Sequence, residues 1–282
     1  MDFNLSLDRI ITTALEEDVG FSDITGEYTV AADATASGRF TAKESGVLCG
    51  VDVARRVFLT VDGSVQFEAY FHDGDAVKKG DVIAAVSGKA RSLLAAERTA
   101  LNLMQRLSGI ATRTREAADA VAGTGARIVD TRKTTPGLRV LEKYAVRCGG
   151  GFNHRFNLAD GILIKDNHIV AAGGIKKAVA AARALAPHTL KIEVEVEDMA
   201  GLREALAAGA DVIMLDNMDV AQMASAVREV NGRALVEASG NMGDRDAAGL
   251  RSVAETGVDI ISIGALTHSV RSMDISLKFV MG

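Results

Sequence analysis

The sequence predicts an α/β protein in which short strands flanked by helices precede an incomplete α/β barrel. After residue 127, β-branched runs alternate with helix-like segments at intervals of roughly 20–35 residues, the spacing of βαβ units with parallel strands. Glu193, Glu195 and Glu197 alternate with valines, so the three carboxylates share one face of their strand. Strands covered by helices on both sides are apolar on both faces, so this polar face favours a barrel with a polar interior over an open doubly wound sheet.

The open sheet remains the alternative, but no Gly-x-Gly-x-x-Gly motif follows any of the predicted strands, which excludes its usual dinucleotide-binding version.

The chain of 282 residues is long enough for one large or two unequal domains. Its net charge of −5 argues against binding along a nucleic acid. The apolar runs are too short to cross a membrane, and the start of the sequence does not read as a secretion signal. Two cysteines make no disulfide framework, so we expect a cytoplasmic protein.

The first region is expected to contain four short strands between two helices. Turn residues such as Asp73-Gly74 separate the strands. The predicted helices cover residues 6–17 and 92–122, and Gly109 weakens the second prediction because glycine destabilises a helix interior. The predicted strands are residues 38–42, 46–50, 65–71 and 82–86.

The second region is expected to contain six parallel strands. Helix-like segments, for example 199–208 and 220–230, lie between them. In a barrel of parallel strands the chemistry takes place at the carboxyl ends of the strands, so the residues that end each run are the candidates for a site. The six runs are residues 128–130, 162–165, 192–195, 212–216, 234–239 and 260–264.

Cationic residues gather near these strand ends, although the chain as a whole is acidic. Arginine binds carboxylates and phosphates through two parallel hydrogen bonds, and lysine adds a compact charge. Any one of these cations is equally well explained as surface charge, except Lys165, which an apolar strand leads into and which needs a partner if buried. Together they predict an anion-binding site. The candidates are Arg106, Arg132, Lys133, His154, Arg155 and Lys165.

Two carboxylates, Glu195 and Asp216, end neighbouring strands. Such a pair can hold Mg²⁺ through water, bind sugar hydroxyls or stabilise developing positive charge. The alternative is a structural role in which they neutralise Lys165 and Lys133.

Glycines follow the last two strands, within Ser239-Gly240-Asn241 and Ile263-Gly264-Ala265. They allow backbone N–H groups to approach a phosphate, although glycine also simply ends strands.

Several long strings in the chain resemble the quinolinate phosphoribosyltransferase family, and the resemblance covers nearly the whole sequence. Chance does not produce strings of this length. They are Glu97–Asn102, Arg106–Thr112, Asp130–Arg139, Lys143–Gly151, Asn153–Arg155, Leu163–His168 and Met214–Asn217.

The resemblance implies a type II phosphoribosyltransferase fold: an incomplete barrel of six to seven strands in residues 116–271, preceded by an α+β open-faced sandwich in residues 1–115. Residues 272–282 are expected to return to the first domain. It implies the transfer of the phosphoribosyl group of 5-phosphoribosyl 1-pyrophosphate (PRPP) to quinolinate in NAD biosynthesis. The products are nicotinate mononucleotide, pyrophosphate and CO₂, and the cofactor is Mg²⁺. The working unit is at least a homodimer.

The resemblance also implies roles for individual residues. Arg106 is expected to reach the neighbouring subunit's site. The expected catalytic residues are Lys133, Glu195 and Asp216. Of these, Glu195 and Asp216 are expected to lie near the ribose and Mg²⁺. Asn241 departs from the Ser-Gly-Gly of many members, but asparagine tolerates the left-handed backbone, so we expect phosphate binding to persist. Thr131, Arg132, Lys133, His154, Arg155 and Lys165 are expected to hold carboxylates and phosphates, and Ser239, Gly240, Asn241, Ile263, Gly264 and Ala265 the 5′-phosphate.

Two other functions remain possible on the sequence alone. A related phosphoribosyltransferase would act on another anionic pyridine, and CO₂ release distinguishes it. A carrier module is suggested by residues 68–92, which look like a biotinyl or lipoyl domain but lack the modified-lysine motif.

Overall fold

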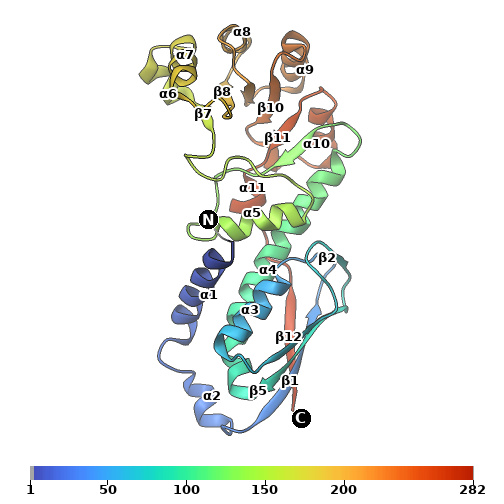
Figure 1. Cartoon of the computed structure of the whole chain (residues 1–282). Helices are drawn as coiled ribbons and strands as arrows, with labels where there is room; N and C mark the ends of the chain where they lie inside the picture. The colour runs from blue at the N-terminus through green and yellow to red at the C-terminus, as the bar shows by residue number, and fades with distance from the viewer. Residues whose placement is uncertain (1–2, 282) are drawn as a thin grey trace. The chain divides into compact units, whose positions relative to one another are not determined.

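The computed structural model describes residues 3–281 and divides the chain into two compact units (Figure 1). The first unit comprises residues 1–115, 134–150 and 270–282, and the second comprises residues 116–133 and 151–269. Neither unit is continuous in sequence, and the expected domain ranges 1–115 and 116–271 stay a prediction. No helix among the described residues is long and apolar enough to span a membrane.

The first unit is built on a four-stranded antiparallel sheet with the strand order β12-β1-β5-β3. Alternate residues of β1 are buried, so one face of this strand packs on the core and the other is mostly exposed. The last strand along the chain, β12, pairs with β1 in the register Ala36↔Met281 to Ala42↔Ile275. The strands are β1 (Thr35–Ala42), β3 (Gln66–Ala69), β5 (Val82–Lys89) and β12 (Ile275–Met281), with β2 (Gly46–Val47) and β4 (Ala76–Val77) forming a separate pair.

Five helices complete the described part of the first unit, and the last part of α4 continues into the second. Phe58 of α3 contacts Phe40 of β1 and Phe67 of β3, with ring centroids 5.9 and 6.1 Å away, so α3 covers the buried face of the sheet. Gly109 in α4 is explained by close packing, because a Cβ there would collide with the carbonyl oxygen of Arg271. The helices are α1 (Phe3–Val19), α2 (Ile24–Thr29), α3 (Val51–Val61), α4 (Ala90–Ala120) and α5 (Arg139–Cys148).

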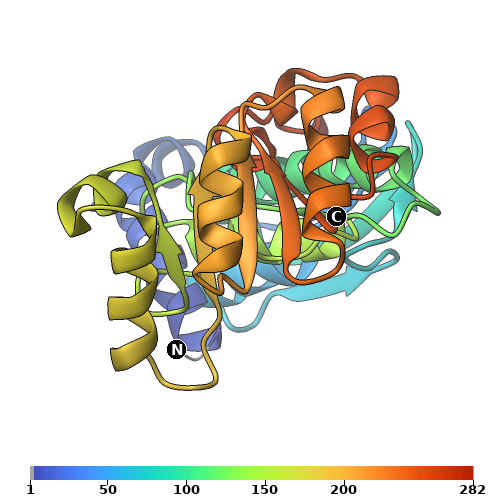
Figure 2. The ribbon, with the colours of Figure 1, turned by 90° about the horizontal axis from the view of Figure 1, so that it is seen from above.

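The second unit contains six parallel strands in the order β6-β11-β10-β9-β8-β7. Helices that follow the strands lie side by side along one face of the sheet (Figure 2). Among the described residues β6 and β7 are the two edges, so the barrel is incomplete and the α/β prediction is confirmed. The strands are β6 (Arg127–Val129), β7 (Ile162–Ile164), β8 (Ile192–Val196), β9 (Val212–Asp216), β10 (Leu235–Ser239) and β11 (Ile260–Ser262). The helical segments are α6 (Asp166–Ala172), α7 (Ile175–Leu185), α8 (Met199–Ala207), α9 (Val220–Val230), η1 (Met242–Asp244), α10 (Ala247–Ala254) and α11 (Ala265–His268).

Two local expectations need correction. The strand expected at 46–50 ends at Val47, because Gly50 has a φ of 97° and caps the start of α3. Glu197 lies just beyond β8 and is exposed, whereas Glu193 is buried and Glu195 half-buried. The polar face of β8 therefore contains two carboxylates rather than three.

Candidate active site

A pocket of about 540 Å³ lies in the second unit at the carboxyl ends of the parallel strands. We call it the active pocket. Its lining combines cations, carboxylates and the residues after β10, and it includes eleven of the fifteen site residues predicted from the sequence. These eleven are Thr131, Arg132, Lys133, His154, Arg155, Lys165, Glu195, Asp216, Ser239, Gly240 and Asn241; Leu163, Met214, Asn217, Glu237 and Ser262 complete the lining.

The segment after β6 is tied to the segment that contains His154. Asp130 is fully buried, and its carboxylate accepts hydrogen bonds from the Asn153 side chain at 2.6 Å and from the backbone N–H of His154 at 2.9 Å. The carbonyl of Lys133 accepts a hydrogen bond from the Thr267 hydroxyl at 2.7 Å. These bonds fix the backbones that present the cations to the pocket.

His154 faces two buried carboxylates. Its Nε2 lies 3.1 Å from Glu193 Oε2 and 3.6 Å from Glu237 Oε2. Its Nδ1 accepts a hydrogen bond from the backbone N–H of Arg155 at 2.8 Å, which assigns a ring proton to Nε2. Burial, together with the neighbouring Glu193, raises the pKa of Glu237 to about 8, so Glu237 is mostly protonated at neutral pH.

Arg155 and Arg132 lie near each other in the same pocket. Burial, and next the charge of Arg132, lowers the pKa of the Arg155 guanidinium, although the group stays protonated. Arg155 also donates a hydrogen bond to the carbonyl of Gly161 at 3.0 Å. Two guanidinium groups that repel each other are stabilised when an anion binds between them.

Lys165 follows directly after β7 and forms an ion pair with Glu195 across the pocket, with Nζ 2.5 Å from Oε2. Its side chain is 44% exposed, so the ammonium is not buried. It is open to the pocket and has Glu195 as the partner that a buried lysine would have needed. The backbone N–H of Lys165 donates to His168 Nδ1 at 3.0 Å, which fixes the start of α6.

The residues after β9 and β10 interlock. Asn241 donates a side-chain hydrogen bond to Asn217 at 3.1 Å, and Asn217 donates one to Asp216 at 3.0 Å. Asn217 and Asn241 have φ values of 54° and 52°, so Asn241 adopts the left-handed backbone, as expected. Gly240 has a φ of 85°, and a Cβ there would lie 2.8 Å from the backbone nitrogen of Asn217. Glycine is therefore required at this position.

Four predicted residues do not line the active pocket. Arg106 belongs to the first unit, where its guanidinium pairs with buried Glu142 at 2.6 Å and donates to the Thr135 hydroxyl at 2.7 Å. Ile263, Gly264 and Ala265 stand at the start of α11. Gly264 is next to a pocket residue, because a Cβ there would approach Lys133 Cδ to 3.0 Å.

Glu237 and Asn217 are pocket residues to which sequence reasoning gave no role. A signal for Glu237 was present, because it is the one charged residue in the otherwise largely apolar strand β10. Asn217 had a weaker signal, since it simply follows Asp216 at a strand end.

Comparison with known families assigns both parts of the chain. Residues 23–108 match the model for "Quinolinate phosphoribosyl transferase, N-terminal domain", and residues 110–278 match the model for the C-terminal domain of the same family. The chain belongs to the quinolinate phosphoribosyl transferase family. This confirms the resemblance found in the sequence, from the first strands to the end of the incomplete barrel.

Relatives within the quinolinate phosphoribosyl transferase family match over almost their full length. The chain is 46% identical to the probable nicotinate-nucleotide pyrophosphorylase [carboxylating] of Bacillus subtilis, in an alignment that covers 99% of this chain and 95% of that protein. It is also 46% identical to the nicotinate-nucleotide pyrophosphorylase [carboxylating] of Mycobacterium leprae, over 98% of each chain. The crystal structure of NadC from Streptococcus pyogenes superposes with a TM-score of 0.93 at 45% identity, covering 98% of this chain and 97% of that one.

Proposed function

We propose that the active pocket is where this member of the quinolinate phosphoribosyl transferase family transfers a phosphoribosyl group from PRPP to quinolinate in NAD biosynthesis. The products are nicotinate mononucleotide, pyrophosphate and CO₂. One observation carries the proposal: Arg132, Lys133, Arg155 and Lys165 line a single pocket together with Glu195. A dianionic pyridine and a heavily phosphorylated sugar are the kind of substrates that need such a concentration of cations in an acidic protein.

In the proposed complex the cations hold the two carboxylates of quinolinate. Arg132 and Arg155 lie close together, as the effect of one on the pKa of the other indicates, and can each form paired hydrogen bonds with a carboxylate. Lys133 then orients the pyridine so that its ring nitrogen faces the ribose carbon. His154 donates a hydrogen bond to the substrate from Nε2. In the structure, this Nε2 faces Glu193 and Glu237.

Glu195 and Asp216 support the transfer step. The ribose carbon gains positive charge as pyrophosphate leaves, and carboxylates at the pocket edge stabilise that charge. The new bond makes the ring nitrogen a cation. Loss of the neighbouring carboxylate as CO₂ then leaves a carbanion that this cation stabilises, and a proton from water completes nicotinate mononucleotide. The ring itself is the electron sink, so no pyridoxal or thiamine cofactor is required.

The 5′-phosphate is proposed to bind at the ends of the last two strands. Gly240 and Asn241 both have left-handed backbone, and the missing side chain of Gly240 leaves room for a phosphate to approach the backbone N–H groups of this turn. The segment Ile263–Ala265 leads into α11, and Gly264 lies next to the Lys133 side chain, which lines the pocket.

Mg²⁺ fits the chemistry of the donors present. Glu195 and Asp216 offer the hard carboxylate oxygens that Mg²⁺ prefers, and both line the pocket. Each carboxylate is already engaged, Glu195 by Lys165 and Asp216 by Asn217, which suits contact through water better than direct ligation. When bound, Mg²⁺ would neutralise charge on the departing pyrophosphate.

The assembly and location of the protein are part of the same proposal. We expect at least a homodimer in which Arg106 contributes to the neighbouring subunit's site, and we expect no nucleic-acid or membrane partner. The two free thiols, Cys49 and Cys148, suit the reducing cytoplasm.

The decisive experiment incubates the purified chain with quinolinate, PRPP and Mg²⁺. Chromatography measures nicotinate mononucleotide, and ¹⁴C release from carboxyl-labelled quinolinate measures CO₂. We expect the two products in equal amounts, and no product when nicotinate replaces quinolinate. Turnover of nicotinate in preference to quinolinate would instead identify a phosphoribosyltransferase for another pyridine.

A further inference from the structure

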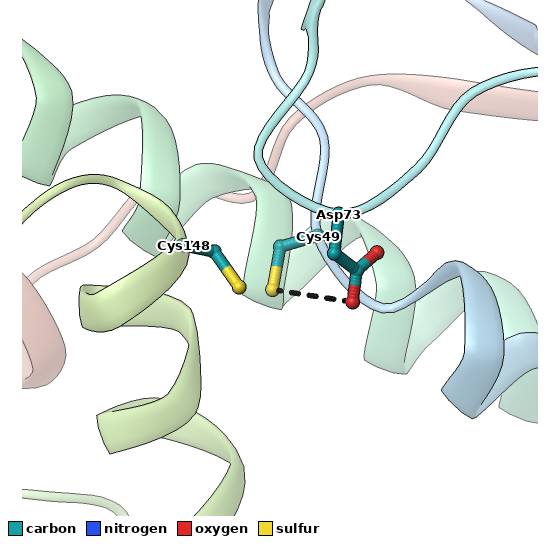
Figure 3. A group of neighbouring side chains, drawn as sticks. All are labelled: Cys49, Asp73 and Cys148. Carbon is teal, nitrogen blue, oxygen red and sulfur yellow. Dashed lines mark hydrogen bonds between the residues drawn. The ribbon is translucent and has the colours of Figure 1, made fainter.

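The first unit contains a second group of reactive side chains, none of which lines the active pocket. The sulfur atoms of Cys49 and Cys148 and a carboxylate oxygen of Asp73 all lie within 4.8 Å of one another. Figure 3 shows the two sulfurs facing each other, with Cys49 Sγ 4.0 Å from Asp73 Oδ2. The distance between the sulfurs is short enough for bonding after a modest movement of the side chains.

Hydrogen bonds hold the backbone of Cys49 and that of Gly149, the residue after Cys148, against the same helix, α4. The N–H of Cys49 donates to the Ser108 hydroxyl at 2.9 Å, and that hydroxyl donates back to the Cys49 carbonyl at 3.0 Å. The carbonyl of Gly149, directly after Cys148, accepts from Arg115 Nε at 3.0 Å. Gly149 packs so tightly that a Cβ would lie 2.6 Å from Thr114 Cβ. The approach of the two sulfurs is therefore imposed by packing.

Asp73 is fixed in the same way. Its Oδ1 accepts the N–H groups of Gly50 and Val51 at the start of α3, at 2.8 and 2.9 Å. Its Oδ2 accepts the Tyr144 hydroxyl at 2.8 Å and faces Cys49. A carboxylate held in this position can receive a proton from Cys49.

The two thiols differ in reactivity. The neighbouring Cys49 thiol lowers the pKa of Cys148, which is only half-buried, whereas burial raises the pKa of Cys49. The thiolate is the reactive form, so Cys148 is the better nucleophile. Cys148 is also the more exposed of the two thiols, so a small oxidant reaches it first. Asp73, on the far side of Cys49 (Figure 3), and Tyr144 line a cavity of about 570 Å³ in this unit.

We propose that Cys49 and Cys148 are a modification site that hydrogen peroxide converts into a disulfide. The Cys148 thiolate attacks one peroxide oxygen and the O–O bond breaks, which leaves Cys148 as a sulfenic acid and releases hydroxide that is protonated to water. The Cys49 sulfur then attacks the Cys148 sulfur. Asp73 takes up the Cys49 proton and passes it to the sulfenic oxygen, which leaves as a second water. Two thiols lose two electrons, and one peroxide becomes two waters. Excess dithiothreitol reverses the reaction by thiol–disulfide exchange.

The test treats the full chain with one equivalent of hydrogen peroxide, blocks remaining thiols with N-ethylmaleimide under denaturing conditions and measures the products by mass spectrometry. In the wild type we expect loss of both alkylation sites and a peptide pair linked through Cys49 and Cys148, reversed by dithiothreitol. In Cys49→Ser, dimedone should label Cys148 as a sulfenic acid. In Cys148→Ser, labelling of Cys49 should be at least about tenfold slower.

The wild-type measurement alone decides the matter, so a variant that folds poorly does not obscure it. Two alkylated cysteines after oxidation, separate oxidation to sulfinic acids, or links only between molecules would each overturn the proposal. Faster labelling of Cys49 than of Cys148 would overturn the assigned order of attack.

Discussion

The charged side chains of the active pocket restrain one another. Arg155 lies near Arg132, Lys165 is paired with Glu195, and the proton on His154 Nε2 faces two carboxyl groups. The pairs of opposite character keep each other's side chains in place, whereas the two guanidinium groups repel each other until an anion binds between them.

Lys133 tests whether this arrangement serves quinolinate. We expect Lys133→Ala to lower kcat/KM for quinolinate by about 10- to 100-fold, because a hydrogen bond to a charged group is worth about 1.5–3 kcal/mol. Steady-state kinetics measures the effect. Lys177→Ala, on the exposed surface of α7, is the matched control and should behave as the wild type. Unchanged turnover by Lys133→Ala would refute the orienting role.

Glu237 makes a prediction about stability and pH. The unfolded chain releases this proton near the ordinary pKa of 4.5, while the folded protein keeps it until about pH 8. Raising the pH through that window therefore favours the unfolded state, by at most about 1.4 kcal/mol per pH unit. Glu237→Gln removes this effect.

We therefore expect urea unfolding to show Glu237→Gln gaining stability relative to the wild type between pH 5 and pH 8. The charged groups that bear on Glu237 are Glu193 and His154, and both are unchanged in the variant. A difference between the two proteins that does not vary with pH would mean that the folded carboxyl is already ionised at pH 5.

At the scale of elements, the site depends on the short segments that follow each strand. Gly240 is the sharpest case, because its φ of 85° and the nearby Asn217 backbone both exclude a side chain. We expect Gly240→Ala to lower kcat/KM for PRPP at least about tenfold by displacing the interlocked asparagines. Kinetics with varied PRPP measures this loss.

Gly209→Ala is the control for backbone strain alone. Gly209 has a similar φ of 80°, but nothing lies within 4 Å of a Cβ there. This variant should lose about 1 kcal/mol of stability and keep its affinity for PRPP. Equal kinetic losses in both variants would show that strain, and not the Asn217 contact, is responsible.

The elements also show what sequence could and could not predict. The parallel strands could be predicted from the sequence because they are buried on both faces and therefore appear as short apolar runs, as β9 does. Helix α5 could not be predicted in this way, because two of its buried residues, Glu142 and Lys143, are charged and interrupt the apolar pattern. Glu142 is buried there because Arg106, distant in sequence, neutralises it.

The same reasoning explains the site. Residues at strand ends were predictable, since parallel strands bring their carboxyl ends to one edge. Glu237 lies inside β10, and only the fold shows that it faces His154.

At the scale of the whole molecule, a mixing experiment tests the proposed dimer. Arg106→Ala and Lys165→Ala should each be nearly inactive. In a mixed dimer, one site would combine the intact Lys165 of one subunit with the intact Arg106 of the other. Co-expression and random pairing should therefore restore about a quarter of wild-type activity.

Activity of the purified, randomly paired mixture is the measurement, and co-expression of Lys165→Ala with Lys133→Ala is the control. Those two changes always leave each site defective, because both residues line the pocket of their own chain. If the Arg106 mixture were no more active than this control, each subunit would have to use its own Arg106.

The pairing of β12 with β1 has a consequence for how the protein is made. Ile275–Met281 leaves the ribosome long after Thr35–Ala42, yet the two strands are neighbours in one sheet. Until β12 has been synthesised, β1 has one unpaired edge, the kind of surface that recruits strands from other chains. The first unit therefore reaches its final form only late in translation, and chaperones that shield nascent chains should matter more for it than for the barrel strands.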